Sequence, residues 1–290
     1  MVRGLAVVAA GVVALSAPAF ARAYHWPVKP FDRQHVIRGS FDDPRFGRYF
    51  HFGVDIAVPD GTAVYAVESG TVFRYSDAVA VLRPGGREFS YWHVRAIVPE
   101  HSFVKAGQEI GVVRPGFGHV HFAEFDGHTY VNPLRRGALT PYRDTTAPVV
   151  GSIEVDVSGN GTMRATVAAF DIPPLRPPGP WRKAVFTPEV VRWRLLSGGS
   201  PVVPWTTAVD FSHFHQPNEY TSIYAPGTRQ NRPNRPGRYV FWLTHGLSLL
   251  DGSYAIQVQA VDTRGNMGFS ATEFEITGDQ SLNTMKLASR

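Results

Sequence analysis

Hydrophobic and polar residues alternate in short runs along most of this chain. Every second residue of 163–169 and of 254–260 is apolar, which is the period of a half-buried β-strand. Between residues 54 and 131, shorter runs of the same kind are separated by turn sequences that contain Gly or Pro. The pattern predicts an all-β protein built from short antiparallel strands.

The alternation lapses near the middle of the chain. Residues 143–148 are mostly polar and end in proline, so we place a boundary between two β domains there. The first domain is expected to span 24–144. The second is expected to span 145–278, and its regular strands predict two sheets packed face to face in an immunoglobulin-like β-sandwich. Residues 279–290 are expected to form a disordered tail.

The N-terminal residues have the layout of a signal peptide. Arg3 precedes an apolar run over 5–15, and small residues follow up to residue 23. Pro18 and Arg22 interrupt the run before it reaches the roughly 20 apolar residues that a membrane span needs. We therefore expect 1–23 to be removed and the mature protein to be exported without a membrane anchor. Its destination would be the periplasm or the extracellular cell wall.

The amino-acid composition excludes several kinds of functional site. The chain has no cysteine, which excludes disulfide bonds, a thiolate zinc site, a cysteine nucleophile and a lipidated N-terminal cysteine. Its 11 His and 24 Asp plus Glu can supply metal ligands of other kinds. Because 43% of residues are hydrophobic and only 18% are charged, the chain is not a disordered polymer.

The net charge is +5, which favours an anionic partner such as a cell-wall polymer. In an exported protein, nucleic acid is not the expected partner. A charge of this size is equally explained by solubility. Residues 226–238 carry four arginines and could hold an anionic polymer, or could be only a mobile insertion.

The first candidate for chemistry is the stretch 51–56, with the sequence HFGVDI. Alternation puts His51, Gly53 and Asp55 on one face and the apolar residues on the other. In a straight strand, residues four apart are separated by about 13 Å, too far to share one metal ion at about 2 Å. A metal site therefore requires a bend, and Gly53 is the residue that permits one. A plain strand with polar ends is the alternative.

The second candidate is GHVHF, residues 118–122. Period-two alternation sends His119 and His121 to one side of the strand and Val120 and Phe122 into the core. Adjacent imidazoles on one face suit a metal ligand beside a group that acts on a substrate.

Two other histidine positions are less specific. His213 and His215 form a similar pair in the second domain, but no His-x-x-x-Asp motif accompanies them, so we interpret them as surface or core aromatics. His93 follows Phe89 and Tyr91 at period two and is expected on their face of a strand. A hydrogen bond to a backbone carbonyl is the alternative role for His93.

In their order along the chain, the stretches 51–56, 89–94 and 118–122 resemble the lysostaphin-type zinc endopeptidases of family M23, which cut peptidoglycan peptides. The resemblance covers 26–134, under half of the chain, and is more specific than either histidine motif alone. The chain departs from the family's pattern in the short loop 114–118 before the second motif and at Asp42, where Gly is common. The matching elements are His51-x-x-x-Asp55, GTAVYAVESGTV (61–72), YWH (91–93), GQEIG (107–111), HVHF (119–122) and VNPL (131–134).

The resemblance implies a first domain of the duplicated hybrid motif type that binds one Zn²⁺ per chain. His51, Asp55 and His121 would be the zinc ligands, and His93 and His119 the catalytic residues. Two imidazoles and one carboxylate leave a fourth zinc position for water, as in catalytic sites. We expect a monomeric peptidoglycan hydrolase that cuts cross-links or stem peptides by attack of a zinc-bound water.

Two functions of other classes compete with hydrolysis. The first domain could be an inactive scaffold that binds the wall or activates another hydrolase, although the intact ligand set argues against this. A phosphocarrier with paired histidines would have a similar β architecture. Its phosphoryl donors are cytoplasmic, however, and the export signal argues against it.

Overall fold

The computed structural model describes residues 23–159 and 161–277. The fold is almost entirely β, as predicted, and its helices are short: η1 (Gly179–Trp181), η2 (Pro217–Glu219) and α1 (Tyr220–Ile223). The predicted signal peptide, apart from residue 23, and the predicted tail 279–290 lie outside the described residues. Within the described ranges, no helix has the length and apolar character needed to cross a membrane.

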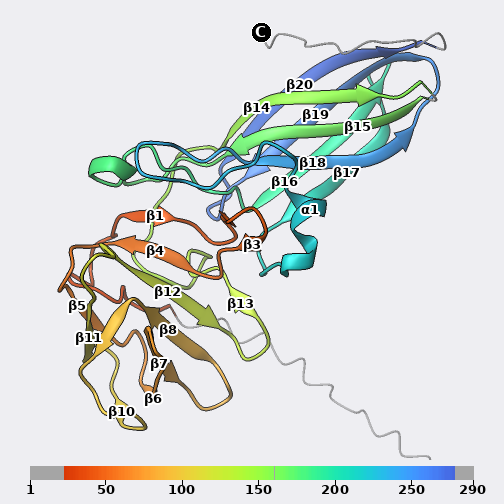
Figure 1. The fold of residues 1–290 in the computed structure, drawn as a ribbon. Coiled ribbons are helices and arrows are strands. Elements are labelled where there is room, and N and C mark those ends of the chain that lie inside the picture. Colours follow the sequence, from red (N-terminus) through yellow and green to blue (C-terminus); the bar gives the residue numbers. More distant parts are fainter. Residues whose placement is uncertain (1–22, 160, 278–290) are drawn as a thin grey trace, which may run out of the picture.

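The first half of the chain forms one lobe, drawn in red to yellow-green in Figure 1. Its strands are β1 (Ile37–Gly39), β2 (Pro44–Arg45), β3 (Tyr49–Phe50), β4 (Val54–Ala57), β5 (Ala63–Tyr65), β6 (Gly70–Arg74), β7 (Ala78–Leu82), β8 (Glu88–Trp92), β9 (Val94–Ala96), β10 (Phe103–Val104), β11 (Glu109–Val113), β12 (His119–Phe125) and β13 (Tyr130–Val131). The main sheet has the order β1-β4-β12-β8-β7-β6-β10, with β13 beside β12. A second sheet, β5-β11-β9, and the pair β2-β3 complete the lobe.

The second half forms the other lobe, drawn in green to blue in Figure 1. Its strands are β14 (Val149–Val157), β15 (Thr162–Phe170), β16 (Val190–Ser197), β17 (Ser200–Asp210), β18 (Val240–Ser248), β19 (Gly252–Val261) and β20 (Met267–Ile276). They make two antiparallel sheets, β14-β15-β18 and β17-β16-β19-β20, which share one hydrophobic core. The second lobe is thus a two-sheet sandwich, and its immunoglobulin-like class stays a prediction.

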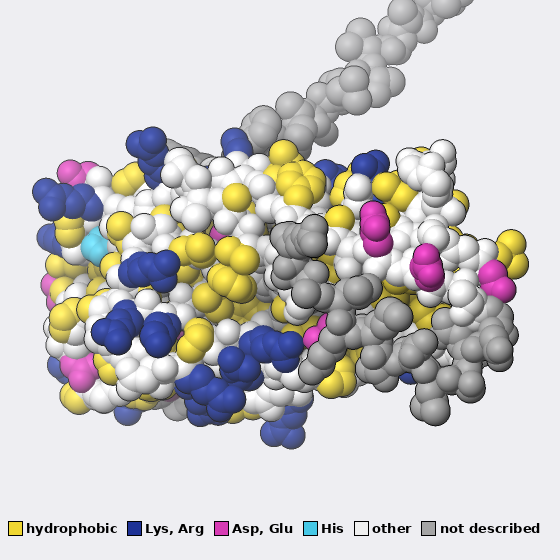
Figure 2. All heavy atoms as spheres, turned by 90° about the horizontal axis from the view of Figure 1, so that it is seen from above, with side chains coloured by type: hydrophobic (Ala, Val, Ile, Leu, Met, Phe, Trp, Pro, Cys, Tyr) yellow, Lys and Arg dark blue, Asp and Glu magenta, His cyan; other side chains and the backbone are white. Residues whose placement is uncertain are grey.

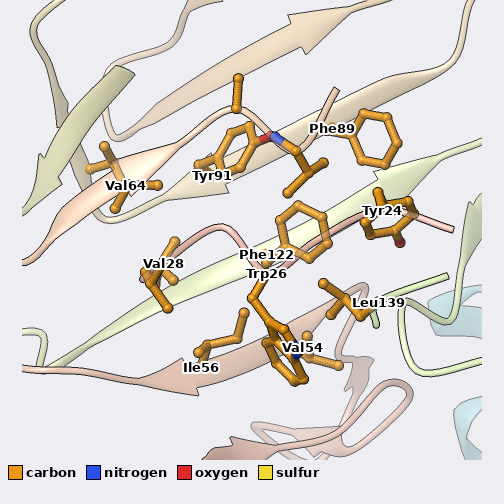
Figure 3. Close-up of a cluster of buried hydrophobic side chains, with 14 of the residues drawn as sticks. Tyr24, Trp26, Val28, Val54, Ile56, Val64, Phe89, Tyr91, Phe122 and Leu139 are labelled. Atoms are coloured by element: carbon orange, nitrogen blue, oxygen red, sulfur yellow. The ribbon is translucent and has the colours of Figure 1, made fainter. Parts of the chain in front are cut away.

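The core of the first lobe supports the strands that carry the histidine motifs. Val120 and Phe122 of β12 are fully buried, as predicted for the inward face of that strand. Figure 3 shows the ring of Phe122 among those of Tyr24, Phe89 and Tyr91. Burying an aromatic or aliphatic side chain contributes about 1.5–3 kcal/mol, so this face fixes the register of β12. The opposite face of β12 is thereby free to carry His119 and His121.

The two lobes are joined by more than the connecting chain. Phe50, at the end of β3, packs into the core of the sandwich, where its ring stacks on Tyr224. Asp42 is buried and pairs with His215, whose Nδ1 lies 3.0 Å from Asp42 Oδ2. The sequence identified His215 only as a surface or core aromatic, but it is a buried partner of a carboxylate. Its neighbour His213 is exposed.

Asp42 also has a left-handed backbone, with φ of 56°. Glycine is the residue most at ease there, and Asp is among the few others that tolerate it. Burial raises the pKa of Asp42 to about 7, although His215 opposes the shift.

The arginine-rich segment 226–238 folds into a hydrogen-bonded hairpin. Its two arms are bridged between Arg229 and Arg238 and between Arg232 and Arg235. Asn231, between the two bridges, is buried, and its amide contacts Val185 and Tyr239. Arg232 and Arg235 are exposed. On the face shown in Figure 2, Lys and Arg side chains outnumber acidic ones.

Candidate metal centre

Three predicted ligand atoms meet at one point on the main sheet. His121 on β12 lies directly opposite Asp55 on β4, because these residues are register partners in the antiparallel ladder. His51 reaches the same point from the segment before β4. Its Nε2 lies 2.7 Å from His121 Nδ1 and 3.1 Å from Asp55 Oδ1, and Asp55 Oδ1 lies 3.2 Å from His121 Nδ1. The bend required between His51 and Asp55 is therefore present.

The bend lies between two strands. β3 ends at Phe50 and β4 begins at Val54, so residues 51–53 leave the extended conformation. The role of Gly53 is mainly one of space, because its backbone does not enter the left-handed region. A Cβ at this position would lie 2.4 Å from the carbonyl oxygen of Phe122 and 3.0 Å from Cε1 of His121. Only glycine lets β12 and the ligand segment approach this closely.

Replacing Gly53 with Ala is expected to lower the free energy of unfolding by about 1–3 kcal/mol, the usual cost of overpacking. The obstacle is a backbone carbonyl, which cannot rotate out of the way as a side chain can. Thermal unfolding followed by circular dichroism measures the effect. Gly246→Ala is the matched control, because its Cβ would meet only the Thr162 methyl at 3.4 Å. An unfolding midpoint equal to that of the wild type would contradict the steric account.

The three residues fit a zinc ion. Ligand atoms at 2.0–2.1 Å from a tetrahedral ion lie about 3.3 Å from one another, and the three separations here are slightly shorter. The Nδ1–H of His51 donates to the carbonyl of Ser40 at 2.7 Å, which leaves Nε2 with a free lone pair. The donor set of two imidazoles and one carboxylate is a common one for zinc.

His121 lacks the second hydrogen bond that usually orients such a ligand. Its Nε2 is buried without a partner among the described residues. Its ring is instead held by aromatic packing, with Phe52 edge-on at 4.4 Å between centroids. His51 is thus fixed by a hydrogen bond and His121 by contact with neighbouring rings.

The electrostatics favour unprotonated imidazoles and an ionised carboxylate. Burial lowers the pKa of His121 to about 4 and lowers the pKa of His51 as well. Burial alone would raise the pKa of Asp55, but His51, His121 and Arg45 together hold it well below its usual range. Metal ligands must be deprotonated, so all three side chains have the required state at neutral pH.

Arg45, which also contacts Asp43, holds the carboxylate oxygen Oδ2 of Asp55. Arg45 Nη2 donates to Asp55 Oδ2 at 3.0 Å, while Arg45 Nη1 lies 3.7 Å from Asp43. Asp43 is fully buried and accepts hydrogen bonds from the Ser40 hydroxyl at 2.6 Å and the Ser40 N–H at 3.1 Å. With Oδ2 occupied by Arg45, Oδ1 is directed to the two imidazoles.

His119 lies next to the cluster and is also buried. Its Nε2 lies 3.5 Å from Asp55 Oδ1, and its Nδ1 lies 2.8 Å from the Phe117 carbonyl and 2.6 Å from Arg38 Nη2. One nitrogen cannot donate to Phe117 and accept from Arg38 at once, so a tautomer change would exchange these contacts. Burial lowers the pKa of His119 to about 4, which keeps the ring neutral.

Arg38 connects this site with the second lobe. Its guanidinium lies 4.6 Å from the ring centroid of Trp181, the last residue of a proline-rich segment, 172–181, in the sandwich lobe. The side chain is therefore held between Trp181 and His119, one on each lobe. Such a guanidinium can pair with a carboxylate or with negative charge that develops on a substrate.

His93 is brought to the same site, but not by the strand alternation. β8 ends at Trp92, and His93 has a left-handed backbone with φ of 65°. Phe89 and Tyr91 point into the core, so the expectation that His93 shares their face is wrong. The reversed backbone instead brings its ring to 4.7 Å from His119 and stacks it on Phe117 at 4.1 Å. The short loop 114–118 supplies that stacking partner.

His93 is oriented by a carboxylate. Its Nδ1 lies 2.8 Å from Asp77 Oδ2, and the other oxygen of Asp77 accepts from Arg114. The backbone N–H of His93 also donates to the Asp77 carbonyl at 2.7 Å. A carboxylate on Nδ1 fixes the tautomer and leaves Nε2 for a substrate or water.

Replacing Asp77 with Asn is expected to lower kcat about 10-fold while leaving zinc content and the unfolding midpoint nearly unchanged. Asn keeps the size and one acceptor oxygen but loses the charge that pairs with Arg114 and His93. Metal analysis and steady-state kinetics separate the effects. Asp156→Asn, at an exposed position of β14, is the matched control. Loss of zinc in the Asp77 variant would show that this carboxylate supports the metal site rather than His93.

Four of these supporting residues could not be identified from the sequence. Arg38, Arg45, Asp43 and Asp77 are single charged residues without a spacing that marks them, and only their pairing in space gives them a role. The one available signal was the segment 40–45 before the first motif, which contains Asp43 and Arg45.

A comparison with protein families finds a match within the first lobe. Residues 49–133 match the sequence profile of peptidase family M23. Comparison with curated proteins gave no match. Among solved structures, Helicobacter pylori Csd3 is 26% identical with a TM-score of 0.35, and the alignment covers 43% of this chain and 37% of Csd3. The chain thus spans little more than a third of that protein.

Two other solved structures are similar to a part of this chain. The M23 metalloprotease pseudoalterin, from the deep sea, is 17% identical over 43% of this chain and 81% of its own, with a TM-score of 0.32. A chain of the SpoIIIAH–SpoIIQ complex is 22% identical over 39% of this chain and 98% of its own, also with a TM-score of 0.32. The family match covers both histidine motifs and the strands that bring them together. The chain therefore carries, over residues 49–133, a domain of peptidase family M23.

Proposed function

We propose that this protein is an exported, zinc-dependent endopeptidase that hydrolyses peptide bonds in the cross-links or stem peptides of peptidoglycan. The observation that supports this most strongly is the convergence of His51 Nε2, Asp55 Oδ1 and His121 Nδ1 within 3.2 Å of one another. An inactive scaffold would not need such a set, because three acceptor atoms at these distances, two of them on buried histidines, are unfavourable without a cation.

The residues around the cluster suit peptide hydrolysis. His51, Asp55 and His121 would hold one Zn²⁺, which when bound lowers the pKa of water towards about 7 and polarises a carbonyl. His93 and His119 stand side by side next to the ligands and can accept a proton from water and return it to the leaving amine. Asp77 orients His93 for this task, and Arg38 can pair with negative charge beside His119.

The charge of the chain supports an anionic wall as the partner. The net charge is +5, and Arg232 and Arg235 are exposed at the tip of the hairpin 226–238. Such groups attract anionic polymers electrostatically. The second lobe would then hold the enzyme on the wall while the first lobe cuts it. Export is part of this proposal and rests on the N-terminal sequence.

Digestion of purified peptidoglycan tests the proposal. Mass spectrometry of the released fragments, with and without a chelator, reports activity, metal dependence and the bond that is cut. We expect new peptide termini without the chelator and intact wall with it. An inactive scaffold would bind the wall and release nothing under either condition, and that result would overturn the proposal.

A further inference from the structure

Three buried carboxylates meet at the junction of the two lobes, far along the chain from the histidine motifs. Asp144 lies in the connecting segment, Asp171 follows β15 and Asp262 follows β19. One carboxylate oxygen from each lies within 4.8 Å of the others, and all three residues are less than a tenth exposed. Ionised carboxylates this close repel one another strongly when water is excluded.

The charges are not balanced by the protein. Among the described residues, none of the ion pairs includes these three carboxylates. The charge of Arg264 acts on Asp144, but its Nε and Nη1 donate to the carbonyls of Tyr142 and Thr263. The cluster therefore needs either protons or a bound cation.

One oxygen of the cluster lacks any partner. Asp144 is 7% exposed, its Oδ1 accepts from the Thr146 N–H at 2.9 Å, and its Oδ2 is buried with no hydrogen bond. A buried carboxylate oxygen without a donor is costly unless something else occupies that side. Burial, with repulsion from Asp144 and Asp262, raises the pKa of Asp171 to about 8. Without a cation, Asp171 thus carries a proton at neutral pH.

The donor chemistry selects the kind of cation. All three groups are carboxylates, and hard oxygen ligands suit Ca²⁺ or Mg²⁺ rather than zinc. Oxygens on opposite sides of Ca²⁺ lie up to about 5 Å apart, so a spread of 4.8 Å fits around one ion. Mg²⁺ keeps several waters. The cavity beside Asp171, lined also by Tyr142 and Thr263, measures about 10 Å³ and has room for only about one water. The waters of Mg²⁺ would not fit there, so the site favours Ca²⁺.

We propose that Asp144, Asp171 and Asp262 form a Ca²⁺ site that fastens the connecting segment to the end of the sandwich. Asp144 belongs to the connection between the lobes, while Asp171 and Asp262 end two strands that lie in opposite sheets of the sandwich. The turn after Asp262 also contacts the first lobe, where Arg136 donates to the Arg264 carbonyl. An ion at this point links these elements and sets how the two lobes meet.

Calcium binding to the full chain, freed of metal on a chelating resin, tests the site. Isothermal titration with CaCl₂ is expected to give one ion per chain with a Kd of about 0.1–1 mM, in the range of extracellular calcium modules. At a hundredfold excess over Kd, the folded-to-unfolded ratio rises about 100-fold and the unfolding midpoint rises by about 5 °C. Absence of binding at millimolar calcium would overturn the proposal.

Three variants locate the ion. Asp171→Asn is expected to lose calcium binding and, without calcium, to unfold near the wild-type temperature, because the amide is neutral like the protonated carboxyl group that it replaces. Asp262→Asn serves as a second variant should the first fail to fold. His121→Ala, which lacks the zinc ligand, is expected to keep the calcium response. Undiminished binding by folded Asp171→Asn, loss of binding in His121→Ala, or an equal shift with MgCl₂ alone would contradict the assignment.

Discussion

Replacing His121 with Ala is expected to remove zinc from the purified protein and to reduce wall digestion by more than about 1,000-fold. Lewis acid catalysis by a metal is worth several kcal/mol, and each 1.36 kcal/mol is a factor of ten in rate. The variant keeps His51 and Asp55, but two ligands hold zinc far less tightly than three. Metal analysis and release of peptide termini measure the two effects on one preparation.

The fold should survive this change. His121 lies on the face of β12 opposite Phe122, so the core that fixes the strand is untouched. Circular dichroism of the variant is expected to match that of the wild type. His128→Ala, in the exposed turn before β13, is the matched control and should keep both zinc and activity. Zinc-free His121→Ala that still digests the wall would show that another part of the chain carries the chemistry.

Replacing His93 with Ala is expected to lower kcat by about 100- to 10,000-fold while zinc stays bound at one ion per chain. A positioned general acid or base contributes that much, and His93 makes no contact with His51, Asp55 or His121 that would hold the metal. The separation of activity from zinc content distinguishes this variant from His121→Ala. Kinetics on a soluble cross-linked peptide, with zinc analysis of the same sample, measures both.

Rescue of His93→Ala by added imidazole is a further test of this role. Added imidazole is expected to restore part of the lost rate, because the cavity left between Phe117 and His119 can admit it. His128→Ala again serves as the control and should show neither loss nor rescue. A His93→Ala variant with full activity would leave His119 as the sole proton carrier. A variant that loses zinc would assign His93 to the metal site instead.

The sequence predicts the all-β fold because its signals are local. Period-two alternation and turn residues depend on neighbours in the chain, and β12 shows them clearly, with Val120 and Phe122 buried and the histidines on the other face. The same reasoning is wrong at His93, where one residue with a left-handed backbone reverses the side chain. No periodicity reports such a residue, since alternation assumes an extended backbone at every position.

The ligand set could be proposed from motifs, but its supporting residues could not. His51 and Asp55 are four apart and demand a bend that the sequence locates at Gly53, whereas the steric reason, contact with the Phe122 carbonyl, exists only in the fold. Arg45 and Asp77 act through partners that are 10 and 16 residues away in the chain. The junction carboxylates are brought together from three distant stretches, which no local pattern links.

The measurement that tests the central claim most directly is the return of hydrolysis as zinc is added to metal-free protein. We predict that release of peptide termini from purified peptidoglycan is absent without zinc, rises in proportion to added zinc and levels off at one ion per chain. The same titration of His121→Ala should stay at the baseline. Release of peptide termini by the metal-free wild type, or none from the zinc-loaded wild type, would contradict the account.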